Sequence, residues 1–529
     1  MKRAVRLCSA FLLCFSMTMV SGCGGSGSSD NSGEKVFRFG QANAKMGLDL
    51  QKSTNSGSSS IADSIVEGLY CFTEENEEVP VLAKDFPTIS EDGLTYSFEL
   101  KEGVKFHDGS VLTSNDVKYT FERMFTPETG ATSTYMYDMI EGAEEMLAGK
   151  ATELSGFEIQ DDTHFTIKLK YPFTPFVKNL GIDYAQIFPQ AACEAAGDKW
   201  GSGMDLIGTG PYKLESNDDL TKVVMVKNSE YHGEEPKLDR IEVIFIDDNN
   251  TKILEYEKGN IDACDLSADF LAQYQDSDLK DEINPYMGLG TYIVNLNLNS
   301  DKLKDVRVRE AISLAINREE FVTSVLNGAG EAASSFLNPK VPGHDDSLDV
   351  YEYNVEKAKQ LLKEAGAEGL TLSAKVRAGD QQRMVAIQGY LKEIGINMDV
   401  QVLDNGVWAS EWQQGSLEVT MIGWFPLYAD ADNQMYTYFY SGNASGKSSF
   451  FNNAEFDNLM TQARSELDES KRAELYKQAD KILSRDEYAT IPVYYPKNQF
   501  LAKPWVKNMK VGNLIYHFND IDIDLDAKK

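Results

Sequence analysis

Two kinds of hydrophobic periodicity interleave along nearly all of the 529 residues. Residues 36–39 and 95–100 alternate between apolar and polar side chains, as half-buried strands do, whereas 307–318 repeats apolar residues at helical spacing. No internal repeat is visible in the sequence. Because the two element types alternate and the chain exceeds the size of one small core, we predict a mixed α/β fold of several domains.

Local signals place several of these elements. Thr113 and Asp116 have the spacing of a capping box, which predicts a helix with its apolar face over 117–124. Residues 354–365 are predicted to form a second helix that ends at Gly366. Further expected elements are an apolar helical stripe over 61–69, two strands within 157–170, two helices within 454–485, and strands over 490–494 and 515–525.

The N-terminus has the organisation of an export signal. Three cations precede a mostly apolar stretch over 7–20, whose length suits a signal-peptide core and is too short to span a bilayer. It ends in VSGC at 20–23, which resembles the lipobox of bacterial lipoproteins. This implies a signal peptide over 1–22, a lipid on Cys23, and a location on the extracytoplasmic face of the cell membrane. Segment 23–34 would be a flexible linker; an ordinary secretory signal with a chance cysteine is the alternative.

Acidic residues outnumber basic ones by 83 to 51, so the formal net charge is −32. No cluster of Lys and Arg is visible, and we expect no nucleic-acid partner, because binding to phosphates requires a basic surface. The acidity is typical of a soluble, self-repelling chain, and we expect a monomer. Beyond the N-terminal stretch there is no apolar run long enough to cross a membrane, so the lipid would be the membrane attachment.

Six cysteines occur in the chain. Two lie in the export signal, Cys23 is the predicted lipidation site, and Cys71, Cys193 and Cys264 remain. These three are far apart, their number is odd and they lack metal-ligand spacing, so we predict buried free thiols. The sequence leaves open whether Cys193 and Cys264 pair.

No sequence motif of catalysis or of metal binding is visible. The five histidines are scattered, and neither HExxH nor GxSxG nor a Cys/His pairing occurs. The HDG sequence at 107–109 is typical of a turn. We therefore predict no catalytic residue, no metal and no cofactor. Paired carboxylates among 83 acidic residues nevertheless leave a lipid-anchored extracellular hydrolase open as an alternative.

A series of short motifs runs through about 490 residues of the chain. They are IVEGL at 65–69, DGLTYSFELKEGVKFHDG at 92–109, GTGPY at 208–212, YHG at 231–233, PKLD at 236–239, GNID at 259–262, VRVREAI at 306–312, the stretch 353–366, and GW at 423–424. In this order they resemble the extracellular solute-binding proteins of family 5, which serve importers of dipeptides, oligopeptides, nickel and some oligosaccharides. Their collinearity behind a lipobox makes the resemblance specific.

The resemblance implies a two-lobed, periplasmic-binding-protein-like fold of the type II or flytrap class. Lobe I would comprise 35–68, 206–290 and 490–529, with an inserted subdomain over 69–205, and lobe II would comprise 291–489. A ligand would be buried between the lobes as they close. The implied function is to deliver a solute, most often a peptide, to the permease and ATPase of an ABC importer. An oligosaccharide ligand and a sensory receptor are the alternatives.

The strongest ligand-site candidate is the segment 423–440. In peptide-binding relatives the Trp of the Gly-Trp pair packs on a ligand side chain, and an Asp three residues later pairs with the peptide ammonium group. Here Trp424 is present, but Leu427 stands at the Asp position. The ligand would therefore have a weakly recognised amino terminus, unless Asp430 or Asp432 takes over the pairing. The predicted ligand-binding residues are Trp424, Tyr428, Asp430, Asp432 and Tyr436, with a Tyr-rich strand over 436–440 and ordinary packing as the alternative role.

Overall fold

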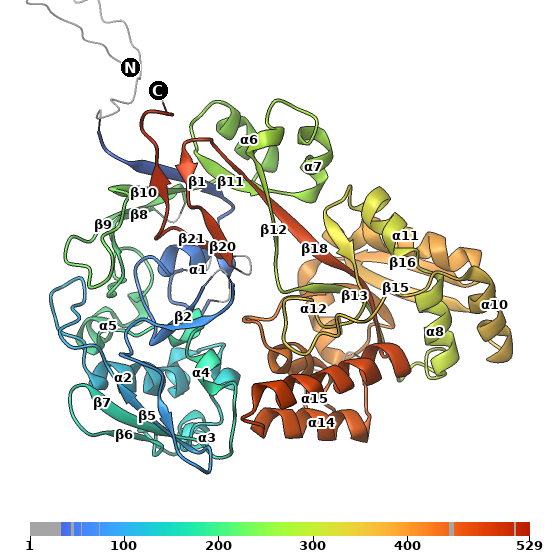
Figure 1. The fold of residues 1–529 in the computed structure, drawn as a ribbon, viewed down its shortest axis with the longest axis horizontal. Helices are drawn as coiled ribbons and strands as arrows, with labels where there is room; N and C mark the ends of the chain where they lie inside the picture. The colour runs from blue at the N-terminus through green and yellow to red at the C-terminus, as the bar shows by residue number, and fades with distance from the viewer. Residues whose placement is uncertain are drawn as a thin grey trace, which may run out of the picture. The chain divides into compact units, whose positions relative to one another are not determined.

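A twelve-stranded sheet runs through the described part of the computed structural model (Figure 1). The described residues are 33–43, 47–53, 55–73, 75–218, 220–443, 449–512 and 515–528. Cys23, the export signal and most of the linker therefore lie outside them. Across the sheet the strands are β16 (Asn397–Leu403), β15 (Thr371–Arg377), β17 (Val419–Trp424), β13 (Thr291–Leu296), β18 (Thr490–Ala502), β11 (Ala263–Leu266), β1 (Val36–Gln41), β10 (Arg240–Phe245), β9 (Lys222–Lys227) and β8 (Tyr212–Asp218), with β12 (Ile283–Met287) and β14 (Gly330–Ala332) beside β18.

The long strand β18 belongs to both halves of this sheet, as Figure 1 shows. Residues 490–496 pair with β13 and β14, and residues 497–502 pair with β11 and β12. The predicted strand over 490–494 is thus confirmed but is longer than expected. The proposed boundary between 489 and 490 falls at the start of a strand that both halves share.

A separate four-stranded sheet forms within 69–205, in the order β4 (Thr88–Ile89), β5 (Thr95–Glu99), β7 (His164–Lys168) and β6 (Phe157–Ile159). The strands predicted over 95–100 and within 157–170 are therefore confirmed. Helix α2 (Ser114–Phe125) packs beside them and begins at the predicted capping box, in which the Thr113 backbone N–H donates to the Asp116 carboxylate at 2.9 Å. α4 (Phe176–Asn179) and α5 (Gln190–Ala196) follow.

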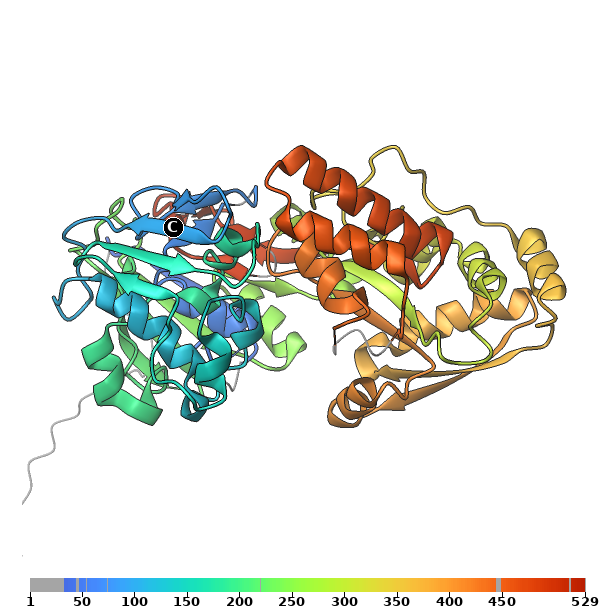
Figure 2. The same ribbon diagram turned by 90° about the horizontal axis from the view of Figure 1, so that it is seen from below.

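Longer helices accompany the strands of 291–489. They are α8 (Val306–Ala315), α10 (Val355–Glu364), α11 (Gln381–Glu393), α12 (Asn405–Gln414), α14 (Ala454–Ser465) and α15 (Glu469–Lys481). The Asn354 side chain accepts from the Lys357 N–H at the start of α10, and Gly366 after its end has a φ of 66°, as the sequence predicts. The two helices predicted within 454–485 are α14 and α15, which lie side by side (Figures 1 and 2).

Three predictions about local structure were wrong. Helix α1 (Ser56–Ala62) stops before Ile65, whose carbonyl instead accepts from the Gly210 N–H at 2.9 Å. The Tyr-rich segment is not a strand but the π-helix Asp432–Tyr436 followed by α13 (Thr437–Phe439), because the rings of Tyr436 and Tyr440 stack one helical turn apart at 4.4 Å. The last expected strand divides into β21 (Ile515–His517) and β22 (Asp522–Ile523).

The remaining short elements complete the described fold. They are β2 (Tyr70–Phe72), β3 (Glu78–Pro80), α3 (Ala143–Leu147), α6 (Asn249–Glu257), α7 (Ala268–Tyr274), α9 (Arg318–Glu320), β19 (Val506–Lys507) and β20 (Lys510–Gly512). Cys71, Cys193 and Cys264 are free thiols, of which Cys71 is only half-buried, so Cys193 and Cys264 do not pair. Among the described residues, no helix combines the length and the apolar character needed to cross a membrane.

Candidate ligand-binding site

A cavity of about 670 Å³ lies between the segment 135–179 and the segment 412–464. Four of the five predicted ligand-binding residues line it, namely Trp424, Tyr428, Asp432 and Tyr436. The opposite wall comes from Tyr135, Met136, Asp138, Tyr171, Phe173 and Asn179. A cavity of this size, with aromatic walls and a few polar groups, has the properties of a small-ligand site.

Trp424 is held at the cavity by the end of β17. It lies opposite Thr291 of β13, so the central sheet fixes its backbone. Its ring packs against that of Tyr438 with a centroid distance of 3.9 Å. The indole N–H is buried and has no hydrogen-bond partner among the described residues. This donor is therefore available to a ligand in the cavity.

Tyr428 connects the two walls directly. Only 2% of it is exposed, and its hydroxyl donates to the side-chain oxygen of Asn179 at 2.6 Å. Its ring stacks on Phe72, with centroids 5.8 Å apart. Tyr428 therefore contributes to the contact between 69–205 and lobe II as well as to the cavity wall.

Asp430 does not line the cavity. Its carboxylate is paired with two cations next to the cavity. Arg472 donates to the two carboxylate oxygens at 2.6 Å and 2.6 Å, and the Lys178 ammonium group lies 3.2 Å away. Burial opposes ionisation of Asp430, but the two cations outweigh burial and lower the pKa of the carboxyl to about 2. The structure thus places this predicted residue in an ion-pair network that joins 69–205 to lobe II.

Asp432 also has a cationic partner. Its carboxylate oxygen lies 3.2 Å from the Arg464 guanidinium, and burial raises the pKa of its carboxyl. Arg464 in turn lies over the rings of Tyr436 and Phe173, at 3.7 Å and 4.7 Å. These contacts fix one guanidinium and one carboxylate at the cavity wall. A role in ligand binding for the five predicted residues remains a prediction.

The wall formed by 135–179 was missed by the sequence analysis. Its side chains come from loops, from a 3-10 turn over Thr134–Met136 and from the last residue of α4, and these short segments have no hydrophobic periodicity that marks them as part of a site. The neighbouring Tyr137 and Met139 are buried and fix the backbone from which Asp138 projects. Aromatic residues are not much denser in 135–173 than in the chain as a whole, so composition gives no signal for this segment either.

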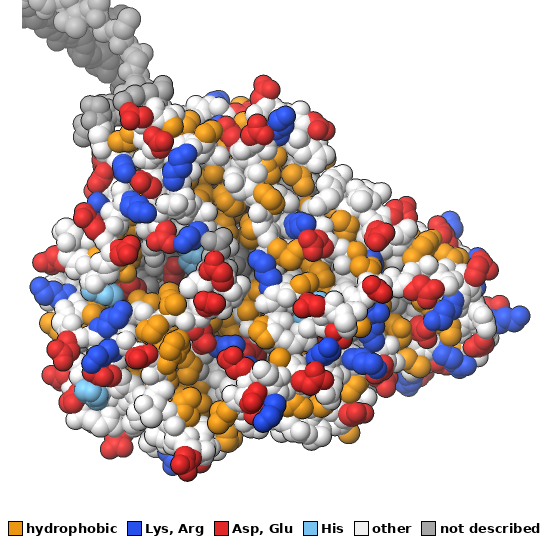
Figure 3. Space-filling view, viewed as in Figure 1, with side chains coloured by type: hydrophobic (Ala, Val, Ile, Leu, Met, Phe, Trp, Pro, Cys, Tyr) orange, Lys and Arg blue, Asp and Glu red, His pale blue; other side chains and the backbone are white. Residues whose placement is uncertain are grey.

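A second cavity of about 230 Å³ lies along β18. Tyr286 of β12, Tyr292 of β13 and Tyr494 of β18 line it, together with Arg383. On the face in Figure 3, hydrophobic side chains gather over the region where Figure 1 places β12 and β18. This cavity too has walls from both halves of the sheet, and no sequence motif indicates it.

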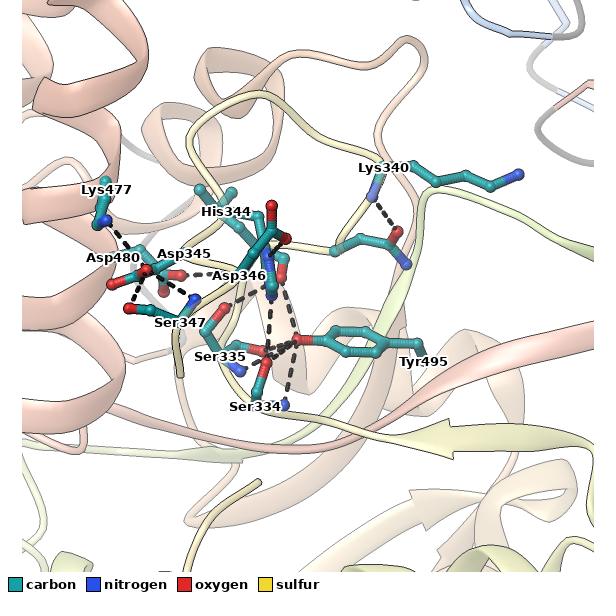
Figure 4. Close-up of polar contacts among 12 residues, drawn as sticks. Ser334, Ser335, Lys340, His344, Asp345, Asp346, Ser347, Lys477, Asp480 and Tyr495 are labelled. Carbon is teal, nitrogen blue, oxygen red and sulfur yellow. Dashed lines mark hydrogen bonds and ion pairs between the residues drawn. The ribbon is translucent and has the colours of Figure 1, made fainter. Parts of the chain in front are cut away.

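A contact chain of the serine–histidine–aspartate type links Ser334, His344 and Asp346 (Figure 4). It resembles a hydrolase triad in its order of residues but not in its environment. The Ser334 hydroxyl lies 3.2 Å from one ring nitrogen of His344, and the other nitrogen lies 3.0 Å from Asp346. However, the Ser334 and Ser335 N–H groups both donate to the Tyr495 hydroxyl, and Ser334 is 9% exposed and lines neither cavity. The network therefore lacks an accessible nucleophile and free oxyanion donors.

No group of three or more His, Cys, Asp or Glu side chains in the described part of the chain is arranged to hold a metal ion. Of the features described above, the larger cavity with aromatic walls is therefore the best candidate for a ligand-binding site. Two lobes that share β18, with a ligand-sized cavity between them, define a hinged binding protein.

The chain belongs to the bacterial extracellular solute-binding proteins of family 5, whose middle region matches residues 77–446. Among curated proteins it is similar to the dipeptide-binding protein DppE of Bacillus subtilis, with 27% identity over 496 residues and 90% of each chain covered. It is also 27% identical to the periplasmic oligopeptide-binding protein OppA of Salmonella typhimurium, over 87% of each chain. The solved structure of the Escherichia coli murein tripeptide binding protein MppA matches with a TM-score of 0.77 at 23% identity, covering 93% of this chain and 99% of that one. The fold is therefore the predicted two-lobed α/β fold.

Proposed function

We propose that this protein is the extracytoplasmic binding component of an ABC importer and that it captures a peptide in the cavity between 135–179 and 412–464. The cavity itself carries this proposal, because its opposite walls come from the two lobes. Two similar proteins, DppE of Bacillus subtilis and OppA of Salmonella typhimurium, are named for the dipeptides and oligopeptides that they bind.

Closure of the lobes would bury the peptide and create the shape that the permease recognises. Contacts that both lobes must supply include the Tyr428–Asn179 hydrogen bond and the Lys178–Asp430 ion pair. A ligand adds further contacts to both walls, so it shifts the population toward the closed state. The peptide leaves unchanged, because binding alone performs this function.

The aromatic walls also suit an oligosaccharide, which is the second candidate ligand. Trp412 and Trp424 present rings to the cavity, and sugar rings stack on such faces. A peptide is favoured because similar proteins, such as DppE and OppA, are named for dipeptides and oligopeptides.

The proposal extends to the attachment of the protein. Cys23 would carry the lipid, segment 23–34 would act as the tether, and the folded body would work as a monomer on the outer face of the membrane. A diacylglyceryl group supplies two acyl chains, which hold a protein firmly at a bilayer.

A thermal-shift screen of the body, residues 35–529, tests the proposal. Tripeptides and longer peptides are compared with oligosaccharides at equal concentration. Stabilisation by peptides is expected, since a ligand at 100 times its Kd stabilises the folded state by about 2.7 kcal/mol. Stabilisation by oligosaccharides alone would favour the second candidate, and no shift with either class would contradict both.

A further inference from the structure

One carboxylate in the cavity has no partner of its own. Asp138 lines the cavity from the 135–179 wall, and it makes no hydrogen bond or ion pair with any other described residue. The side chain is half-buried, and burial raises the pKa of its carboxyl. A half-buried carboxylate without donors is costly, unless a ligand supplies them.

The cations nearest to Asp138 are already committed elsewhere. Lys170 donates to Glu144 at 2.7 Å, outside the cavity. Arg464 is paired with Asp432 at 3.2 Å and is held between two aromatic rings. Both cations act on Asp138 only at longer range, where they partly oppose the effect of burial on its pKa.

The charge balance of the cavity therefore favours a cation. Among the described residues, its charged lining consists of two carboxylates and one guanidinium, so this part of the lining has one negative charge in excess. Since Asp432 and Arg464 neutralise each other, that excess resides on Asp138. Tyr171 lines the same cavity wall as Asp138 and leaves 40% of its surface exposed, and its pKa is raised by burial and, to a smaller extent, by the Asp138 charge. An aromatic face next to a carboxylate is a favourable place for an ammonium group.

The backbone around Asp138 is fixed, as a recognition residue requires. Tyr137 is buried and its hydroxyl donates to the Asn179 carbonyl at 2.7 Å. The Asn179 side chain donates back to the Met136 carbonyl at 2.6 Å. The Met139 carbonyl accepts from the Lys170 N–H at 2.8 Å. The backbone that carries the carboxylate is thus preorganised, so a ligand would need to order only the Asp138 side chain.

We infer that Asp138 is the residue that receives a primary ammonium group of the ligand, an inference that rests on the proposed function. The segment after Trp424 cannot supply this carboxylate, because Leu427 is apolar and Asp430 and Asp432 are already paired. The ammonium group would therefore bind at the 135–179 wall and not at the loop after Trp424, where the sequence analysis expected it. The ammonium group belongs either to the amino terminus of a peptide or to a lysine side chain.

A competition experiment with mixed tripeptides tests this inference. The body of the protein is incubated with an equimolar mixture of a random tripeptide library and the same library N-acetylated, and the retained peptides are counted by mass spectrometry. Wild type is expected to retain free-amine peptides, or acetylated peptides that contain lysine, at least about tenfold over acetylated peptides without lysine. A preference of this size is typical of one hydrogen bond to a charged group.

Asp138→Asn keeps the shape of the side chain and removes its charge, so it should still retain peptides but lose this preference. Glu128→Gln is the matched control, because Glu128 is exposed in the same subdomain and does not line the cavity. Melting temperatures of the two variants show that both are folded. A preference that is absent in wild type, or that persists in Asp138→Asn, overturns the assignment alone. Retention of no peptide by wild type overturns the proposed function and this assignment with it.

Discussion

Breaking the buried ion pair between Arg472 and Asp430 is expected to destabilise the protein by about 3–5 kcal/mol, the cost of leaving a buried charge without its main partner. The guanidinium meets both carboxylate oxygens at 2.6 Å, and only 7% and 1% of the two side chains are exposed. In Arg472→Met, Asp430 keeps the Lys178 ammonium group, at 3.2 Å, as a charged partner. The methionine restores apolar volume but supplies no donor.

The same pair predicts a pH dependence. The pKa of Asp430 is about 2 in the folded protein against an ordinary value of 3.8. Because the folded value is the lower one, the stabilisation is fully present above the unfolded pKa and is lost as pH falls through the folded pKa. Without Arg472 the pKa of Asp430 rises, and the carboxyl takes up a proton already at mildly acidic pH. Arg472→Met should therefore lose less stability relative to wild type at pH 4 than at pH 7.

The assay is a double-mutant cycle of Arg472→Met, Asp430→Asn and the double variant, by urea unfolding at constant slope. The loss of stability in the double variant should be smaller than the summed losses in the two single variants by about 2 kcal/mol or more. Lys84→Met is the control, because the Lys84–Glu99 pair has an N···O distance of 2.5 Å but leaves 60% and 39% of its side chains exposed. This control should lose far less stability than Arg472→Met, because solvent screens an exposed ion pair. Additive losses, or a loss in Arg472→Met no larger than in the control, would refute the reasoning.

Four further predictions concern the lobes, the cavity and the anchor. Burial raises the pKa of Glu78 to about 7 from 4.5, so the folded state holds the proton longer than the unfolded state. As the pH rises from 4.5 to about 7, the free energy of unfolding should therefore fall by on the order of 2–3 kcal/mol. Melting curves of Glu78→Gln should lack this decline. Tyr428→Phe leaves the Asn179 side-chain oxygen unpaired and should cost about 1–3 kcal/mol in urea unfolding, whereas an unchanged midpoint would argue against the contact. Trp424→Ala should weaken peptide binding at least about tenfold by calorimetry, because aromatic contact is lost, with a cooperative melting transition above the assay temperature as the check on folding. Cys23→Ala should move the protein from the membrane to the soluble fraction of cells. Equal partition of wild type and variant between the two fractions would contradict the proposed lipid on Cys23.

Features with local determinants could be predicted from the sequence. The capping box at Thr113 and Asp116 lies within one helical turn, and Asn354 and Gly366 are the two ends of a single helix. Each of these signals acts through neighbouring backbone groups, so no knowledge of the rest of the fold is needed. The order of the family motifs likewise predicted the two-lobed fold without any contact being known.

Features that depend on distant contacts could not be predicted. α1 ends early because the backbone after it pairs with the segment around Gly208 and Gly210, where a β-carbon at Gly208 would lie 2.1 Å from the Ile65 carbonyl oxygen. Asp430 is paired by Arg472 and Lys178, which are 42 and 252 residues away. The Gly-Trp motif drew attention to a segment that lines one side of the cavity, whereas the facing wall has no comparable motif.

Native mass spectrometry of the body with the tripeptide library tests the central claim most directly, because it reports both stoichiometry and the identity of the bound molecule. The account predicts one peptide per protein, released with unchanged mass, and a bound fraction that falls sharply in Trp424→Ala. A protein that carries no peptide at saturating concentration, or that releases cleaved peptides in excess of its own amount, would contradict the account.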